Sequence, residues 1–189
     1  MERLVTLQGF AERRGVDFDP TDLKARRALD DASAFIRSYT GQTLSLVQDD
    51  EVELRGTWRS VLFLPERPVI DVTEVSVRYH GSTAFALVTG YVQRGAMLHM
   101  SGGYWGGDTG AVVVTYSHGN ETIPADLAAV CASIAARGMA DLGGALVSET
   151  MGPYSYTLGT NASGGPLGLT DNEARVLRRY TPAEEVPVP

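Results

Sequence analysis

The sequence is poor in the features that support disulfide-rich, metal-clustered or membrane-spanning folds. Cys131 is the only cysteine, which excludes an internal disulfide framework and a cysteine-based metal cluster and is typical of a reducing compartment. The least polar stretch, Ala125–Ala140, contains Asp126 and Arg137 and is too short to span a bilayer. The first ten residues carry charges and no sustained apolar run, so no signal peptide is expected. We therefore expect a soluble intracellular protein that makes no membrane contact.

Positive charge is also scarce. The 189 residues include 16 lysines and arginines against 23 aspartates and glutamates, for a formal net charge of -7, and Lys24 is the only lysine. A protein that grips nucleic acid through its phosphates needs a basic face, so this function is disfavoured, although a local basic patch remains open. Hydrophobic residues at 43% are enough for a core, and the length suits one domain with extensions.

Catalytic, metal and cofactor signatures are missing as well. His80, His99 and His118 are too scattered for a metal-binding helix pair. Ser117 and His118 are adjacent in a predicted strand, where successive side chains point to opposite faces and do not pair. We predict no enzymatic activity and no cofactor. A serine, a histidine and an acid brought together from distant positions leave a small hydrolase open as an alternative.

Two helices are predicted before residue 42. Leu4, Leu7 and Phe10 have helical spacing, and Gly15 closes the first helix. For the second, we predict Asp19 as the N-cap, Pro20 in the first turn and Gly41 as the stop. Its apolar stripe is Leu23, Ala28, Leu29, Ala32, Ile36 and Tyr39, and its predicted solvated face is Lys24, Arg26, Arg27, Asp30, Asp31 and Arg37.

Between residues 44 and 116 the hydrophobic period changes to two, which indicates a β-sheet. The predicted strands are Glu51–Leu54, Val61–Leu64, Val72–Tyr79, Ala86–Gln93, Met97–Met100 and Ala111–Tyr116. Short glycine- and proline-containing links favour antiparallel hairpins. Trp58 and Trp105 are expected to be packing or interface aromatics.

A third helix is predicted to begin at Ile123–Leu127 and to be packed on more than one side, because it is rich in alanine. Residues 143–168 form a long glycine-rich segment, which we expect to be an arm ordered by lying on another chain. Thr170 and Glu173 predict a capping box for a last helix ending near Tyr180. The expected fold is thus α+β, with a core domain over residues 1–142, an arm over 143–168 and a C-terminal helix and tail over 169–189.

Five segments in this order resemble the head-to-tail adaptor, or connector, proteins of long-tailed bacteriophages. They are Leu29–Thr40, Leu62–Val69, Val112–Leu127, Glu149–Leu158 and Leu169–Tyr180. The resemblance implies a structural protein of the virion neck, made in the host cytoplasm, that forms a homo-oligomeric ring, commonly a dodecamer, under the portal. The portal protein, further copies of this chain and the next neck protein, the stopper, would be its partners. DNA would pass through the ring channel without specific binding.

The resemblance, together with the residue pattern, gives the candidate contact residues. The arm is expected to contact a neighbouring subunit through Met151, Tyr154, Tyr156 and Leu158, because alternating large residues of an extended segment point to one side. The portal is expected to meet Leu169, Arg175, Val176, Leu177, Arg178, Arg179 and Tyr180. Candidate acids facing the DNA channel are Asp49, Asp50, Glu51 and Glu53.

Two structural alternatives remain at this stage. Another neck ring protein, the stopper or the tail terminator, would share the ring and the location. The long N-terminal helical region and the predicted order of helix, sheet, helix, arm and helix favour the adaptor. For the aromatic residues of the arm and for the last helix, packing on their own domain is the alternative to packing on a partner.

Overall fold

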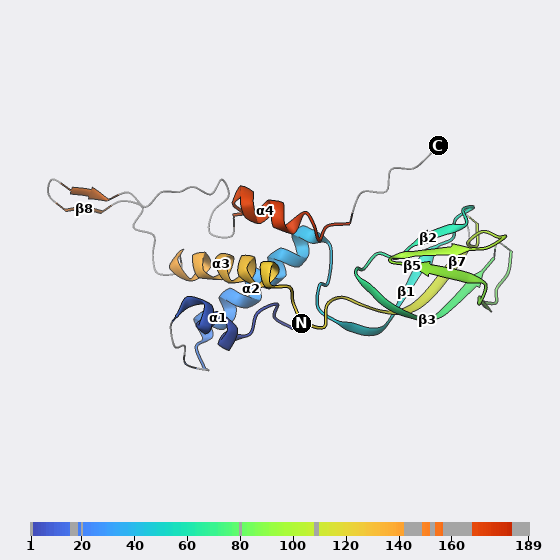
Figure 1. The fold of residues 1–189 in the computed structure, drawn as a ribbon, viewed down its shortest axis with the longest axis horizontal. Coiled ribbons are helices and arrows are strands. Elements are labelled where there is room, and N and C mark those ends of the chain that lie inside the picture. Colours follow the sequence, from blue (N-terminus) through green and yellow to red (C-terminus); the bar gives the residue numbers. More distant parts are fainter. Residues whose placement is uncertain are drawn as a thin grey trace. The chain divides into compact units, whose positions relative to one another are not determined.

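The computed structural model describes residues 2–15, 19, 21–79, 81–107, 110–141, 149–151, 154–156 and 168–182. The chain divides into two compact units. One, which we call the helical unit, is built from residues up to 41 and from 123 onward, and the other, the β unit, spans Gln42–Thr122 (Figure 1). Helices and antiparallel sheets are both present, so the predicted α+β class is confirmed. The division into a core domain over 1–142 with two extensions stays a prediction.

The first helix, α1, spans Leu7–Arg14 and has a polar cap at each end. The Thr6 hydroxyl accepts a hydrogen bond from the Gly9 backbone N–H at 3.0 Å. Gly15 ends the helix in the left-handed conformation, with φ of 62°, as the sequence predicted. Phe10 is the fully buried residue of α1 and anchors it in the helical unit.

The second helix, α2, spans Leu23–Thr40 and is capped by Asp22, so the prediction of Asp19 as the N-cap is wrong. The Asp22 carboxylate accepts from the backbone N–H groups of Lys24 and Ala25 at 2.9 and 3.0 Å. Asp19 instead accepts from the N–H and the hydroxyl of Thr21 in the turn before the helix. Both aspartates can accept backbone hydrogen bonds, and the cap is the one that directly precedes the first helical residue.

The buried stripe of α2 is narrower than predicted. Leu29, Ala32 and Ile36 are fully buried, but Leu23 at one end of the helix is 64% exposed and Tyr39 near the other end is 38% exposed. Arg37 was expected on the solvated face and is instead buried, donating to the backbone carbonyl of Glu2 at 2.6 Å. Burial lowers the pKa of Arg37.

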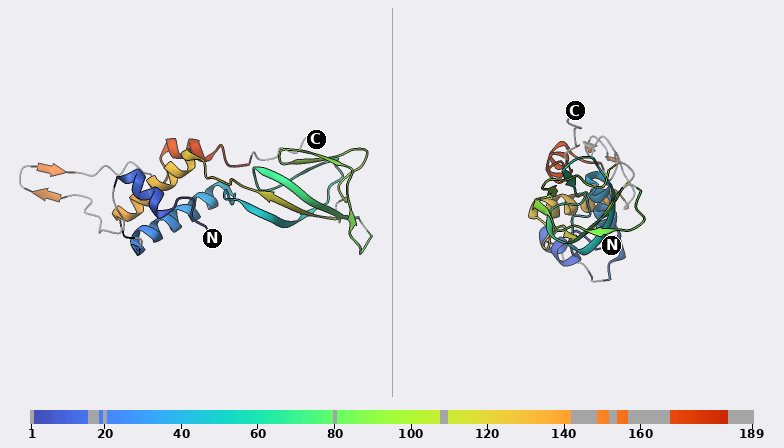
Figure 2. Two further views of the ribbon diagram at one scale, coloured as in Figure 1. Left: turned by 60° about the horizontal axis from the view of Figure 1, so that its bottom comes forward. Right: turned by 90° about the vertical axis from the view of Figure 1, so that its right-hand side faces the viewer.

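The third helix, α3, spans Ala125–Asp141, begins directly after Pro124 and packs against α2 (Figure 2). Its buried face contains Leu127, Cys131 and Ile134, as predicted. Cys131 lies 3.6 Å from the Ser33 hydroxyl of α2, and burial raises the pKa of its thiol. Cys131 is therefore a core residue. Among the residues that the structure describes, no helix is long and apolar enough to cross a membrane.

The β unit contains two antiparallel sheets. The larger has the order β1–β7–β3–β4, and its strands are Val47–Arg55, Ala111–His118, Val69–Arg78 and Ala86–Leu87 respectively. The smaller has the order β2–β6–β5, with strands Val61–Phe63, Met97–Met100 and Tyr91–Arg94. Antiparallel pairing is confirmed, but β7 lies between β1 and β3, so the larger sheet is not a run of successive hairpins.

The predicted strand Ala86–Gln93 is in fact two strands in different sheets. β4 pairs with β3 over Ala86 and Leu87, and the next residue, Val88, still donates to the Val75 carbonyl at 2.8 Å. The chain then leaves this sheet, and β5 pairs with β6 from Tyr91 onward. An alternating pattern does not reveal such a change of partner, because both halves keep the period of two.

A core of aliphatic and aromatic side chains fills the β unit. Trp105 and Tyr116 are fully buried, together with Leu64, Leu98, Val77, Val112 and Val114. The Trp105 indole N–H donates to the backbone carbonyls of Ser60 and Leu98 at 2.9 and 3.2 Å, so its polar atom is satisfied. Trp105 is thus a packing aromatic, whereas Trp58 is 60% exposed.

Candidate interaction surfaces

The last helix, α4, spans Asp171–Leu177 and begins with the predicted capping box. The Thr170 hydroxyl accepts from the Glu173 backbone N–H at 3.3 Å, and the Glu173 carboxylate accepts from the Thr170 N–H at 2.9 Å. The helix ends at Leu177, and tighter turns follow through Tyr180, whose N–H donates to the Leu177 carbonyl. This end is three residues earlier than predicted.

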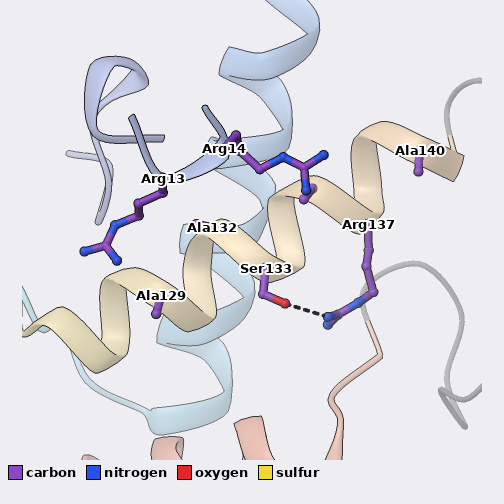
Figure 3. Close-up of a pocket in the computed structure, with 8 residues that line it drawn as sticks. Arg13, Arg14, Ala129, Ala132, Ser133, Arg137 and Ala140 are labelled. Carbon is purple, nitrogen blue, oxygen red and sulfur yellow. Dashed lines mark hydrogen bonds between the residues drawn. The ribbon is translucent and has the colours of Figure 1, made fainter. Parts of the chain in front are cut away.

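A bidentate ion pair fastens α4 to α3. The Arg137 guanidinium donates to the two Glu173 carboxylate oxygens at 2.8 and 3.0 Å. It also donates to the Gly168 carbonyl at 2.8 Å and to the Ser133 hydroxyl at 3.0 Å, the bond drawn in Figure 3. Burial alone would raise the pKa of Glu173, but hydrogen bonds from Arg137 and Thr170 outweigh it and hold the pKa at about 2. Glu173 is therefore ionised at neutral pH.

A second polar contact joins the residues after α4 to the first turn of α3. The Tyr180 hydroxyl donates to the Asp126 carboxylate at 2.7 Å. Burial and the Asp126 carboxylate together raise the pKa of Tyr180 to about 12. α4 also packs against α2, and Leu177 is fully buried. The C-terminal helix is thus an integral part of the helical unit.

The seven residues predicted to meet the portal fall into two groups. Leu177 is buried inside the helical unit, and Leu169, Val176 and Tyr180 are half-buried. Arg175, Arg178 and Arg179 are exposed. A partner would therefore contact the three exposed arginines, because Leu177 is already packed inside the helical unit. Portal binding by these residues stays a prediction.

The arm residues lie in a small hairpin where the structure describes them. β8, Glu149–Met151, pairs antiparallel with β9, Tyr154–Tyr156, and Met151 is the register partner of Tyr154. The expected extended conformation around Tyr154 and Tyr156 is therefore present, and its strand partner is β8. Leu158 and most of the glycine-rich arm lie outside the described residues. The predicted contact with a neighbouring subunit stays a prediction.

The acidic run lies on strand β1, and its members do not share one face. Asp49, Glu51 and Glu53 are exposed, and the register of Glu51 with Thr115 and of Glu53 with Val113 places both on the outer face of the larger sheet. Asp50 is the register partner of Tyr116, whose side chain belongs to the core. The Asp50 carboxylate lies 3.2 Å from His118 Nε2. Strand alternation separates neighbouring acids in this way. A channel-facing role for these four residues stays a prediction.

An open groove of about 620 Å³ lies between α1 and α3 in the helical unit (Figure 3). Its basic side chains are Arg13, Arg14 and Arg137, and the rest of its lining is Ala129, Ala132, Ser133, Ala136 and Ala140. Among the described residues that line it, none carries a carboxylate, a thiol or an imidazole. No group of three or more potential metal ligands occurs among the described residues.

Sequence reasoning missed several of these contacts. Arg37 was assigned to a solvated face, and the Arg137–Glu173 pair was not expected because its partners are 36 residues apart. The rings of Trp58 and Tyr104, which are also distant in the sequence, lie in contact at a tilt of 42°, with their centroids 4.7 Å apart. A charged or aromatic residue carries no local signal that identifies a partner on another element.

The comparisons with known proteins give one family. A model of head completion proteins matches residues 3–135. The chain belongs to the head completion protein family. Family membership identifies a structural protein of head completion, which confirms the resemblance inferred from the sequence and the prediction that the chain is not an enzyme.

Solved structures similar to this head completion protein come from gene transfer agent particles. The neck of an empty particle, computed with C6 symmetry, gives a TM-score of 0.55 at 17% identity, covering 98% of this chain and 93% of the other. The neck of a native particle, computed with C12 symmetry, gives a TM-score of 0.51 at 16% identity, covering 99% of this chain and 97% of the other. A native virion gives 0.52 at 17% identity with the same coverage. These matches show a shared fold, and no curated protein matches the sequence.

Proposed function

We propose that this head completion protein is a head-to-tail adaptor of the virion neck. It forms a ring beneath the portal, joins the capsid to the next neck protein and leaves a channel through which DNA passes. Three observations support this proposal: the family match, the shared fold with chains of gene transfer agent necks, and the C12 symmetry with which one of those necks was computed. Twelve copies is the number that this symmetry favours.

The observation that carries the portal contact is the anchoring of α4. Arg137 and Tyr180 fix the helix on the helical unit through Glu173 and Asp126, and Leu177 packs beneath it. Because α4 and the turn that follows it are held in place, the exposed Arg175, Arg178 and Arg179 form a pre-oriented basic surface. Guanidinium groups bind carboxylates in a defined geometry, so the expected partner is an acidic surface of the portal.

The test reverses the charge of this surface without touching the anchors. The variant Arg175→Glu, Arg178→Glu, Arg179→Glu changes three exposed residues, whereas truncation at Thr170 would also remove the buried Leu177. The matched control is Lys24→Glu, Arg26→Glu, Arg27→Glu, which reverses three exposed charges on α2. We expect the α4 variant to lose binding to purified portal rings and the control to keep it.

The outcomes separate the adaptor from the alternatives. An α4 variant that binds the portal as tightly as the wild type would remove α4 from the portal contact. A wild-type chain that forms rings without binding the portal would indicate another neck ring protein, such as a stopper or tail terminator.

A further inference from the structure

An exposed cluster of aromatic side chains lies where strands β1 and β3 end. We call it the aromatic tip: Trp58, Tyr79, Phe85 and Tyr104, which are 60%, 42%, 45% and 41% exposed. The rings of Trp58 and Tyr104 are 4.7 Å apart, and Tyr79 meets Tyr104 edge-on at 6.4 Å. The residues come from three separate loops of the β unit. Scattered exposed aromatics are ordinary, but a connected group marks an interaction site.

Arginines accompany these rings. The Arg78 guanidinium lies over the Phe85 ring at 5.4 Å, and Arg55 and Arg78 are both register partners of Ala111. Arg55 and Arg78 therefore lie side by side across β7 on the outer face of the larger sheet, at the end next to the aromatic tip. Tryptophan, tyrosine and arginine are the residues that contribute most to the energy of protein interfaces. The composition of the tip is thus that of a protein-binding surface.

The same face is acidic away from the tip. Glu51 and Glu74 are both register partners of Thr115, and Asp49, Glu53 and Asp71 flank them; all five are exposed. We call this set the acidic face. Glu53 lies 3.8 Å from Arg78, where the acidic face meets the tip. The strand extends about 20 Å from Asp49 to Arg55. Over this distance the charge of the outer face changes from negative to positive.

We infer that the aromatic tip of one copy docks on the acidic face of the next copy, so that the β units join head to tail. The inference rests on the proposed ring and names the surfaces that close it. A tip and a face are different patches, and a contact between different patches is the heterologous kind that a ring requires. Charge complementarity selects the partner, because the same chain carries both the basic aromatic surface and the acidic one.

This assignment gives Asp49, Glu51 and Glu53 a subunit contact in place of the channel-facing role expected from the sequence. Single-stranded nucleic acid is the other ligand that basic aromatic surfaces bind. The carboxylates of the acidic face disfavour nucleic acid as the ligand. They lie on the same surface of the larger sheet as the tip and would repel the phosphates of a strand bound there. The observations therefore favour a second copy, and nucleic acid becomes an outcome of the test.

The experiment uses the full chain in three forms. The tip variant is Trp58→Ser with Arg78→Glu, the face variant is Glu51→Arg with Glu74→Arg, and the charge control is Arg94→Glu, an exposed residue of the smaller sheet. Because Trp58 packs against Gly107, Tyr104→Ser serves as a second tip variant that leaves this packing intact. Sedimentation velocity over a concentration series measures self-association of the chain alone and its association on purified portal rings. The same method measures binding of single-stranded DNA oligonucleotides.

Each tip or face variant is expected to weaken association between copies at least about tenfold, and Arg94→Glu to behave as the wild type. A mixture of tip and face variants is expected to form dimers and nothing larger, because only one intact tip and one intact face remain to pair. This pattern distinguishes a heterologous contact from a symmetric one.

Several results would overturn the inference. They are a wild-type chain that associates neither alone nor on portal rings, variants that associate as the wild type does, and a tip variant that loses only the binding of single-stranded DNA oligonucleotides. The proposed function fails separately: a wild-type chain that does not bind the portal contradicts the adaptor, even where tip and face variants abolish self-association.

Discussion

Arg137 on α3 holds Glu173 on α4 through two parallel hydrogen bonds of 2.8 and 3.0 Å, and the carboxylate is almost fully buried. The pair closes the helical unit, because it joins the C-terminal helix to the helix at its centre. Its geometry is the bidentate arrangement that makes arginine more effective than lysine in buried ion pairs. Any surface that α4 offers to a partner depends on this pair.

The first prediction concerns the loss of Arg137. In Arg137→Met, Glu173 would stay buried without its cation, so the free energy of unfolding should fall by about 3 kcal/mol. Urea denaturation followed by circular dichroism measures it, with the exposed Arg175→Met as control. Adding Glu173→Gln to Arg137→Met should recover part of the loss. A decrease below about 0.5 kcal/mol would contradict the anchoring role.

The second prediction concerns pH. The pKa of Glu173 lies at about 2, below its ordinary value of 4.5, so its ionised form stabilises the folded state. This stabilisation is complete above pH 4.5 and is lost as the pH falls towards 2. The urea midpoint of the wild type should therefore decrease more steeply between pH 5 and pH 2 than that of Glu173→Gln. Parallel curves for the two proteins would contradict the shift.

The third prediction separates two adjacent residues of α4. Leu177 is fully buried and Val176 half-buried. Leu177→Ala should lower the free energy of unfolding by about 3 kcal/mol, whereas Val176→Ala should cost clearly less. Thermal and urea unfolding measure both variants. Equal and small effects would show that Leu177 is free to contact a partner, as the sequence alone suggested.

The fourth prediction concerns a close approach of two backbone segments in the β unit. A Cβ on Gly56 would lie 2.9 Å from the Trp105 carbonyl oxygen and would also collide with the Gly107 carbonyl oxygen. Gly56→Ala should therefore destabilise the β unit by about 2 kcal/mol. Gly90→Ala is the matched control, since a Cβ there meets nothing within 4 Å. Near-UV circular dichroism and urea unfolding distinguish the two variants.

Local sequence signals predicted the helices well because caps and apolar stripes are local features. Gly15, Gly41 and the Thr170–Glu173 capping box were identified from the sequence alone, since each acts within one helical turn. The prediction of Asp19 as the N-cap failed because Asp19 accepts from the Thr21 N–H in the preceding turn, whereas Asp22 accepts from the first N–H groups of the helix.

Pairings between distant elements were not predictable from the sequence. The position of β7 between β1 and β3, the division of Ala86–Gln93 between two sheets and the burial of Arg37 all depend on tertiary contacts. For the same reason the apolar residues of α4 were assigned to a partner, although Leu177 packs on its own unit. An amphipathic helix shows that a face is buried, and the sequence does not show what buries it.

The most direct test of the adaptor assignment is an image of the complex formed by the full chain and purified portal rings. Electron cryomicroscopy should show one ring of this chain, with twelve copies, seated on the portal through Arg175 of α4 and through Arg178 and Arg179 in the turn that follows it. A chain that does not bind the portal, or that attaches only to a protein further along the neck, would contradict the account.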